Sequence, residues 1–316
     1  MKIVILDAFT ANPGDLSWEG LKALGEVEIH ERTAPEEVIS RCAGAEIVLT
    51  NKALVPAEAI EALPDLKYIG VVATGVNVVD LDAAKEAGVV VTNVPGYSTD
   101  SVAQLSFALI LELASRVGDH SRAVADGVWE DCADFSFTTS PIVELSGKQL
   151  GIIGFGAIGQ ATAKVAAALG MKVVVYNRTR EKVVDFPYAP LDEVIATSDV
   201  VSLHCPLTPE TDQLMNADRL ASMKEGAWLI NTSRGPLVDE AALADSLNSG
   251  HLGGAGLDVL CKEPMAKGNP LRTAKNCLIT PHIAWATREA RVRLIDQVVA
   301  NISAWQADKP LNVVNA

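Results

Sequence analysis

Three ionisable residues in the second half of the chain have types that suit anion binding and proton transfer. They are Arg234, Glu263 and His282, which follow the apolar runs 227–230, 254–257 and 277–279. An arginine fork binds a carboxylate through two parallel hydrogen bonds, and a histidine carries a proton near neutral pH. A glutamate beside the histidine would orient the ring and raise its pKa. Together these groups would suit the addition of hydride and a proton to a keto acid.

Each of these residues also has an ordinary structural explanation when it is taken alone. The arginine could lie on the surface, the glutamate in a loop, and the histidine could cap a turn. Their shared position favours chemistry, because the carboxyl ends of strands in an open parallel sheet line the ligand crevice. We therefore predict that these three residues converge on one cleft as catalytic residues.

A glycine-rich turn has the spacing of a phosphate-binding loop. It follows the apolar run 149–153 and opens an alanine-rich helical stretch. Such glycines allow a tight turn, close approach of a pyrophosphate, and close packing of helix on strand. The helix N-terminus offers free N–H groups to the phosphates. The predicted cofactor-binding residues are Gly154, Gly156, Ala157, Ile158 and Gly159, and the alternative is a purely structural glycine turn.

The end of the next predicted strand, 172–176, indicates which dinucleotide is bound. An acidic residue normally accepts the adenosine ribose hydroxyls there, and this chain has Asn177, Arg178, Thr179 and Arg180 instead. No carboxylate repels a 2′-phosphate, and two guanidinium groups could bind one. The pattern predicts NADP(H) in preference to NAD(H). If both arginines are solvated loop residues, both cofactors are accepted.

Short apolar runs alternate with helical patterns along almost the whole chain, as in parallel α/β proteins. Strands are predicted near 2–6, 26–30, 46–49, 67–71, 89–92, 149–153, 172–176, 199–203, 227–230, 254–257 and 277–279. Long helices are predicted at 100–117 and 287–305. The irregular stretch 133–145 is either a loop over the domain junction or an arm reaching a second subunit. The pattern predicts an α/β fold with two doubly wound parallel sheets, the C-terminal tail returning to the first.

The composition excludes several classes of protein. The 316 residues carry a formal net charge of −14, which argues against nucleic acid or an anionic membrane as a partner. No apolar run approaches the roughly 18 residues of a membrane span, and the N-terminus reads as a strand rather than a signal peptide. The five cysteines lack CxxC spacing, which favours reduced thiols in the cytoplasm over disulfides or a metal site.

Taken together, these segments resemble the D-isomer-specific 2-hydroxyacid dehydrogenase family along the whole chain. The motifs that carry the resemblance are Gly154–Gly159, 202–208, 231–235, 257–259 and 280–284. The resemblance implies an NAD(P)-dependent dehydrogenase and the roles of arginine, glutamate and histidine given above. It also implies a Rossmann-type dinucleotide-binding domain at 99–286 and a split flavodoxin-like substrate domain at 1–98 plus 287–316. A homodimer built largely on the dinucleotide-binding domain is a further implication.

The same resemblance implies cofactor contacts beyond the glycine turn. Thr232 and Asp258 would hold the nicotinamide amide, and a loop after strand 199–203 would line the adenosine side. The full set of these additional contacts is His204, Cys205, Pro206, Thr232, Ser233, Arg234 and Asp258.

In the first domain, the resemblance places a substrate loop at 73–77. Its backbone N–H groups would grip the carboxylate, although the family often has Ser and Asp where Ala73 and Asn77 stand here. Lys52 would supply a second local cation, or it is an ordinary solvated lysine. Trp285 would cap the pocket; the alternative is that it is a packing residue. The implied substrate-binding residues are Lys52, Ala73, Thr74, Gly75, Arg234, His282 and Trp285.

Within the family, the chain is most similar to the glycerate dehydrogenase/hydroxypyruvate (glyoxylate) reductase branch. This similarity implies glyoxylate or hydroxypyruvate as the substrate. One alternative is another dehydrogenase of the family, acting on phosphoglycerate, D-lactate or a bulkier keto acid. An alternative of a different class is a nucleotide-sensing, corepressor-like binding protein with this fold.

Overall fold

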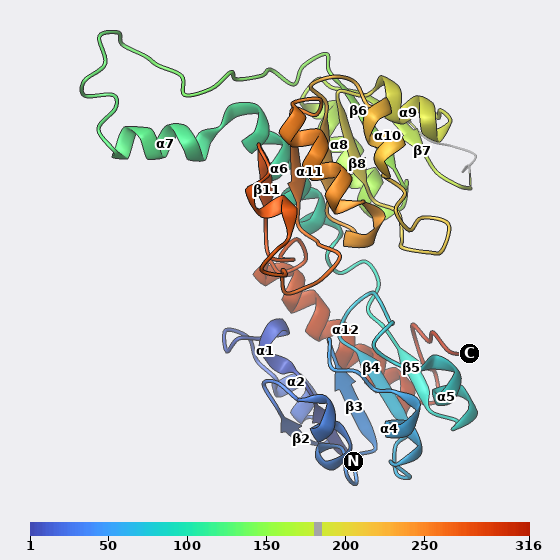
Figure 1. Cartoon of the computed structure of the whole chain (residues 1–316). Helices are drawn as coiled ribbons and strands as arrows, with labels where there is room; N and C mark the ends of the chain where they lie inside the picture. The colour runs from blue at the N-terminus through green and yellow to red at the C-terminus, as the bar shows by residue number, and fades with distance from the viewer. Residues whose placement is uncertain (180–184) are drawn as a thin grey trace. The chain divides into compact units, whose positions relative to one another are not determined.

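The protein consists of two compact units, described here from a computed structural model for residues 1–179 and 185–316. Unit 1 contains Met1–Ser98 and Ala286–Ala316, and unit 2 contains Thr99–Trp285 (Figure 1). Each unit has one sheet, and every strand pair in both sheets is parallel. The predicted α/β class with two parallel sheets is confirmed, and each predicted strand is present.

Unit 1 contains a five-stranded sheet in the order β2-β1-β3-β4-β5. The strands are β1 (Lys2–Ile5), β2 (Glu26–Ile29), β3 (Ile47–Thr50), β4 (Tyr68–Val71) and β5 (Val90–Thr92). The helices are α1 (Ala8–Ala11), α2 (Glu19–Lys22), η1 (Pro35–Glu37), α3 (Val38–Arg41), α4 (Ala57–Glu61), α5 (Leu81–Glu86) and α12 (Arg288–Gln306). The central strands β3 and β4 are buried at every position, which explains their continuous apolar sequence.

The C-terminal segment completes unit 1. Helix α12 begins after Thr287, whose side chain accepts a hydrogen bond from the Ala290 N–H. Arg291 on this helix forms a two-pronged ion pair with Asp15, with both N···O distances 2.7 Å. Beyond the helix, Val313 forms an antiparallel bridge with Thr92 at the end of β5. The tail therefore returns to the first sheet, as the sequence predicts.

Unit 2 contains a six-stranded sheet in the order β11-β10-β9-β8-β6-β7. The strands are β6 (Gln149–Ile153), β7 (Lys172–Tyr176), β8 (Val200–Leu203), β9 (Trp228–Asn231), β10 (Gly254–Leu257) and β11 (Cys277–Ile279). The helices are α6 (Thr99–Ser115), α7 (Val117–Ala125), α8 (Ala157–Ala168), α9 (Leu191–Thr197), α10 (Ala217–Ser222), η2 (Gly235–Leu237), α11 (Glu240–Ser249) and η3 (Pro270–Thr273).

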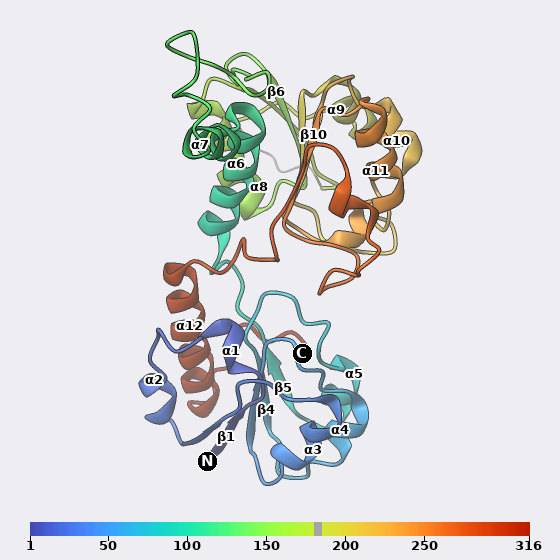
Figure 2. The ribbon, with the colours of Figure 1, turned by 60° about the vertical axis from the view of Figure 1, so that its left-hand side comes forward.

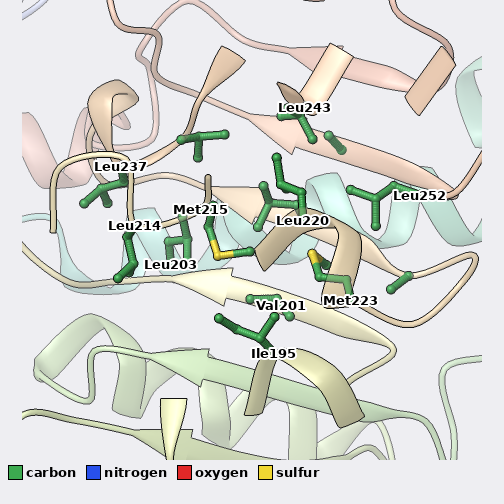
Figure 3. Packing of buried hydrophobic residues seen from close by; sticks show 14 of the residues in the cluster. Ile195, Val201, Leu203, Leu214, Met215, Leu220, Met223, Leu237, Leu243 and Leu252 are labelled. Atoms are coloured by element: carbon green, nitrogen blue, oxygen red, sulfur yellow. The ribbon is translucent and has the colours of Figure 1, made fainter. Parts of the chain in front are cut away.

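Helices cover both faces of this sheet. On one face, α6 and α8 lie side by side (Figure 1 and Figure 2). On the other, α9, α10 and α11 pack through residues such as Ile195, Leu220 and Leu243 (Figure 3). Close-packed aliphatic side chains on both faces hold the strand ends, and the loops that follow them, in fixed positions.

The predicted helix over 100–117 ends two residues early. Arg116 adopts the left-handed conformation, with φ at 51°, so α6 stops at Ser115 and a separate helix, α7, begins at Val117. Helix α7 has no buried residue and projects from the rest of unit 2 (Figure 1). Within the described residues, no single helix is long and apolar enough to cross a membrane; the α6–α7 pair, bent by 58°, passes that test jointly.

Candidate active site

The glycine turn has the geometry of a phosphate-binding loop. Gly154 has φ at +96°, and a Cβ there would lie 2.5 Å from the Cys205 nitrogen. A Cβ on Gly159 would lie 2.3 Å from the Gly154 oxygen, so both positions require glycine. Gly156 differs, because a Cβ there would meet nothing within 4 Å. Its open side is where a pyrophosphate could approach the backbone.

The first turn of α8 can accept such a group. Gly156 is the N-cap residue and provides no side-chain cap, and Ala157, Ile158 and Gly159 form the first turn. In a helix these first N–H groups have no partner within the helix itself. The described residues of this loop therefore fit a dinucleotide pyrophosphate.

The strand end after β7 carries an amide instead of an acid. The Asn177 Oδ1 accepts a hydrogen bond from the Phe155 N–H at 3.2 Å, and its Nδ2 donates to the Thr179 carbonyl at 2.7 Å. Arg178 and Thr179 are exposed, whereas Arg180 lies outside the described residues. The pKa of Glu210 is lowered, mainly by a hydrogen bond with Thr208 and in smaller part by the charge of Arg178.

The loop after β8 lies directly against the glycine turn. Burial lowers the pKa of His204 to about 4, and its Nε2 lies 2.9 Å from the Ser202 hydroxyl. Burial also raises the pKa of the Cys205 thiol to about 11. Both side chains are therefore neutral near pH 7, and Pro206 beside them is exposed. An uncharged surface of this kind suits an adenosine moiety better than a phosphate.

Arg234 is held by its own loop. The buried amide of Asn231 accepts a hydrogen bond from the Ser233 N–H and donates one to the Arg234 carbonyl. The exposed guanidinium donates to the Ser233 carbonyl at 2.7 Å through one nitrogen, Nη1. Thr232, in the same loop, is buried, and its hydroxyl lies 2.9 Å from that of Ser106.

His282 and Glu263 form a pair within unit 2. The His282 Nδ1 lies 2.6 Å from the Glu263 Oε2, and the other carboxylate oxygen accepts a hydrogen bond from the Leu260 N–H at 3.0 Å. His282 has φ at 55°, an uncommon backbone conformation for a non-glycine residue. The contact fixes the ring orientation and leaves Nε2 for proton exchange.

The loop of Arg234 is connected to this pair through close packing. A Cβ on Gly235 would lie 1.9 Å from the Leu260 carbonyl carbon, so the two loops touch backbone to backbone. Leu260 in turn donates its N–H to Glu263. The structure thus brings the loops of the three predicted catalytic residues to the carboxyl ends of β9, β10 and β11.

Asp258 lies beneath the histidine loop. Its buried carboxylate accepts hydrogen bonds from the Thr280 hydroxyl at 2.6 Å and from the N–H groups of Ile283 and Ala284 at 2.9 and 2.8 Å. Burial raises its pKa, and these hydrogen bonds oppose the rise. Asp258 therefore holds the backbone on both sides of His282. Trp285, half-buried, is the last residue of unit 2.

Glu240 is a residue missed in the sequence that holds the loop of Glu263. Its Oε1 accepts a hydrogen bond from the Cys261 N–H, and its Oε2 accepts one from the Asn269 side chain, both at 2.7 Å. These contacts fix both ends of the loop that carries Glu263. The sequence signal is weak, because an acid in the first turn of a helix usually stabilises only that helix.

The substrate loop predicted in unit 1 has unused donors. The Ala73 carbonyl accepts from the Val94 N–H, and the Thr74 hydroxyl donates to the Val94 carbonyl, both at 2.9 Å. The backbone N–H groups of Thr74 and Gly75 donate to no group within 1–179 and 185–316. Such a fixed loop with unpaired donors fits an anion.

Asp7, also missed from the sequence, organises the loop that carries Lys52. The mostly buried carboxylate accepts hydrogen bonds from the N–H groups of Asn51, Lys52 and Ala53. The pKa of Asp7 is raised by burial, and the three backbone hydrogen bonds offset only part of this rise. The Asn51 side chain then donates to the Val72 carbonyl, just before the substrate loop. An acid directly after a buried strand was the available signal.

No metal site accompanies these groups in the described part of the chain, where no three His, Cys, Asp or Glu side chains are placed to hold an ion. The chemistry available here is anion binding by arginine and backbone N–H groups, and proton exchange at the histidine.

Comparison with known proteins supports this interpretation. Residues 107–284 match the family model described as the D-isomer specific 2-hydroxyacid dehydrogenase NAD binding domain. The chain is 50% identical to a hydroxypyruvate reductase of Blautia hydrogenotrophica, over 100% of both chains. It is 43% identical to a glycerate dehydrogenase of Methylorubrum extorquens, over 92% of each. A solved structure, the TT0316 protein from Thermus thermophilus, superposes with a TM-score of 0.89 at 39% identity, covering 99% of this chain and 100% of that one.

Proposed function

This chain belongs to the D-isomer specific 2-hydroxyacid dehydrogenase family and is an NAD(P)-dependent oxidoreductase of small keto acids, and from this premise we propose its substrate and its site residues. The proposed reaction is reduction of hydroxypyruvate or glyoxylate to the corresponding 2-hydroxy acid. The similarity to a hydroxypyruvate reductase and a glycerate dehydrogenase supports this choice. Trp285, close after the histidine in the chain, is proposed to limit the size of the substrate.

The His282–Glu263 pair is the observation that carries the mechanism. A nicotinamide cofactor held by the Gly154–Gly159 turn would supply the hydride for this reduction. His282 donates a proton from Nε2 to the carbonyl oxygen, while Glu263 at 2.6 Å holds the ring through Nδ1 and stabilises its positive charge. Arg234 binds the substrate carboxylate with its guanidinium fork. Within unit 1, the N–H groups of the 73–75 loop and the charge of Lys52 are proposed as further anion-binding groups.

A panel of 2-keto acids tests this proposal. Steady-state kcat/KM should be highest for hydroxypyruvate and glyoxylate, with lower values for pyruvate and branched keto acids. A higher kcat/KM for a bulky keto acid would assign the enzyme to another branch of the family. Cofactor binding without turnover of any keto acid would favour a nucleotide-sensing protein.

We also propose that NADP(H) is preferred over NAD(H). The support is the absence of a carboxylate at Asn177 and the exposed guanidinium of Arg178, which donates no hydrogen bond to another group of the described residues. Charge-assisted bonds to a 2′-phosphate should favour NADPH by roughly tenfold to a hundredfold in kcat/KM. The double variant N177D/R178A should reverse the preference while kcat is retained. Equal kcat/KM for NADPH and NADH at low ionic strength would contradict this proposal.

The assembly that we propose is a homodimer in the cytoplasm. The segment 117–142 exposes six large apolar side chains, namely Val117, Val124, Val128, Trp129, Phe135 and Ile142. In a single chain these side chains are exposed to water. A second copy that covered them would stabilise the assembly by burying their apolar surface. Sedimentation should give twice the 33.4 kDa chain mass, and a W129D/F135D variant should give the monomer. The five free cysteines support a reducing compartment.

A further inference from the structure

A buried pair of hydroxyl groups joins helix α6 to the end of strand β9. Ser106 is fully buried, and its Oγ lies 2.9 Å from the Oγ1 of Thr232, the first residue after β9. The same Ser106 Oγ lies 2.9 Å from the carbonyl oxygen of Val102, one turn earlier in α6. One serine hydroxyl therefore contacts two oxygen atoms in a buried setting.

The chemistry of these groups determines the direction of both hydrogen bonds. A carbonyl oxygen can only accept, so Ser106 donates its single hydroxyl hydrogen to Val102. Ser106 then offers only lone pairs to its other neighbour, and Thr232 must be the donor between the two hydroxyls. With its hydrogen committed to Ser106, the Thr232 Oγ1 presents lone pairs to any ligand.

The sheet order indicates which part of a dinucleotide would meet Thr232. The phosphate-binding turn follows β6, and the proposed 2′-phosphate site follows β7 on one side of it. Strands β8 and β9 lie on the opposite side of β6, so the other half of a bound cofactor would lie near their carboxyl ends. That half carries the nicotinamide ring. Thr232 makes no other side-chain hydrogen bond in the described residues, so its remaining lone pairs have no partner among them.

We propose that Ser106 fixes the hydroxyl of Thr232 as a hydrogen-bond acceptor, and that this polarity selects the –NH2 group of the nicotinamide carboxamide. Ser106 is a positioning residue, because it acts through Thr232. A hydroxyl oxygen that acts only as an acceptor forms a hydrogen bond with an N–H group. It forms none with a methyl group or a carbonyl oxygen. The inference rests on the proposed function, since it takes the end of β9 as the nicotinamide side.

The test compares the dissociation constants of NADP⁺ and its 3-acetylpyridine analogue, in which a methyl group replaces the –NH2. Titration calorimetry on the full chain measures both without turnover. The unmutated protein should bind NADP⁺ about tenfold more tightly than the analogue. In S106A the Thr232 hydrogen is released and can be donated to the acetyl oxygen, so the ratio should fall to about twofold or less.

A matched control distinguishes hydrogen-bond polarity from packing. Ser198 is also fully buried in unit 2 and donates to the carbonyl of the residue four positions earlier, Val194, but it does not contact Thr232. S198A should keep the tenfold ratio. T232S should also keep the ratio, because it retains the hydroxyl, and T232V should abolish it. If S106A does not fold, S106C replaces it in the test, because a thiol keeps the side-chain volume but accepts hydrogen bonds only weakly.

The outcomes separate this inference from the function on which it rests. A ratio in S106A or S106C equal to that of the unmutated protein would overturn the role of Ser106. A fall in the ratio in S198A as large as in S106A would also overturn it, because general loosening would then explain the change. Failure of the unmutated protein to bind NADP⁺ or NAD⁺ would overturn the proposed function itself.

Discussion

Asp7 in unit 1, which is half-buried, and Asp258 in unit 2, which is buried, each hold a neighbouring loop by accepting three hydrogen bonds. Burial raises the pKa of both groups. Around Asp7 the donors are three consecutive backbone N–H groups, including that of Lys52. Around Asp258 the donors are the Thr280 hydroxyl, before His282 in the chain, and the N–H groups of Ile283 and Ala284, after it.

The difference follows from what each loop must do. A side chain that supplies only charge, as proposed for Lys52, needs a fixed backbone at its base. A side chain that transfers a proton must also have its ring oriented to a fraction of an ångström. His282 is accordingly held from both sides by Asp258 and at its ring by Glu263. Proton transfer is therefore expected to depend on unit 2, and substrate affinity on unit 1.

Removal of the histidine should give the largest effect. His282→Ala deletes the proton donor, so kcat should fall by at least roughly 10²-fold while the dissociation constant of the cofactor is retained. Single-turnover and steady-state assays on hydroxypyruvate measure this change. Near-normal kcat would remove His282 from the mechanism and erase the difference between the two units.

Matched substitution of the two carboxylates tests the comparison directly. An asparagine has one acceptor oxygen, so it leaves N–H donors unpaired at either position. Asp258→Asn should lower kcat by about tenfold or more, because the histidine loop loses its support. Asp7→Asn should mainly raise KM, by roughly threefold to tenfold. If Asp7→Asn lowered kcat as strongly as Asp258→Asn, the proposed division of labour would be wrong.

Glu240 allows a finer test within unit 2. Glu240→Ala releases the ends of the loop that carries Glu263, and kcat/KM should fall by about threefold to tenfold. Glu240→Gln keeps an acceptor for the Cys261 N–H and should recover most of the loss. Glu193→Ala, an acid in the first turn of α9, is the control and should have no effect. An equal loss in the control would indicate general destabilisation instead.

The effect expected at His204 is on stability and leaves the catalytic comparison unchanged. Its pKa is lowered from 6.5 to about 4 by burial. The stability that its neutral form contributes is complete above pH 6.5 and is lost as the pH falls towards 4, because the unfolded chain binds the proton first. Between pH 7 and 5 the free energy of unfolding should fall by about 2 kcal/mol more than in His204→Gln. Denaturant titrations measure this difference, and parallel pH profiles would contradict it.

The strands, and the positions of the three proposed catalytic residues just beyond them, could be predicted because their signals are local. Buried parallel strands are continuous apolar runs, and Arg234, Glu263 and His282 each follow one within a few residues. The boundary at Arg116 could not be predicted, since a left-handed residue inside a helical pattern has no clear sequence signal when it is not glycine.

Support residues were missed because their partners are distant in the sequence. Glu240 contacts a backbone N–H 21 residues away, and Ser106 contacts Thr232 across 126 residues. The resemblance implied a contact between Asp258 and the nicotinamide amide, which stays a prediction. The hydrogen bonds that its carboxylate accepts from the N–H groups of Ile283 and Ala284 could not be predicted. The partners of such a side chain can be identified only once the sheet has brought distant segments together.

The return of the C-terminal tail to unit 1 has a consequence for biosynthesis. Unit 2 is one continuous segment, whereas unit 1 needs both the first 98 residues and the last 31, Ala286–Ala316. The bridge between Thr92 and Val313 and the ion pair between Arg291 and Asp15 form only when the final segment has left the ribosome. Residues 1–98 therefore lack these contacts until the whole of unit 2 has been synthesised.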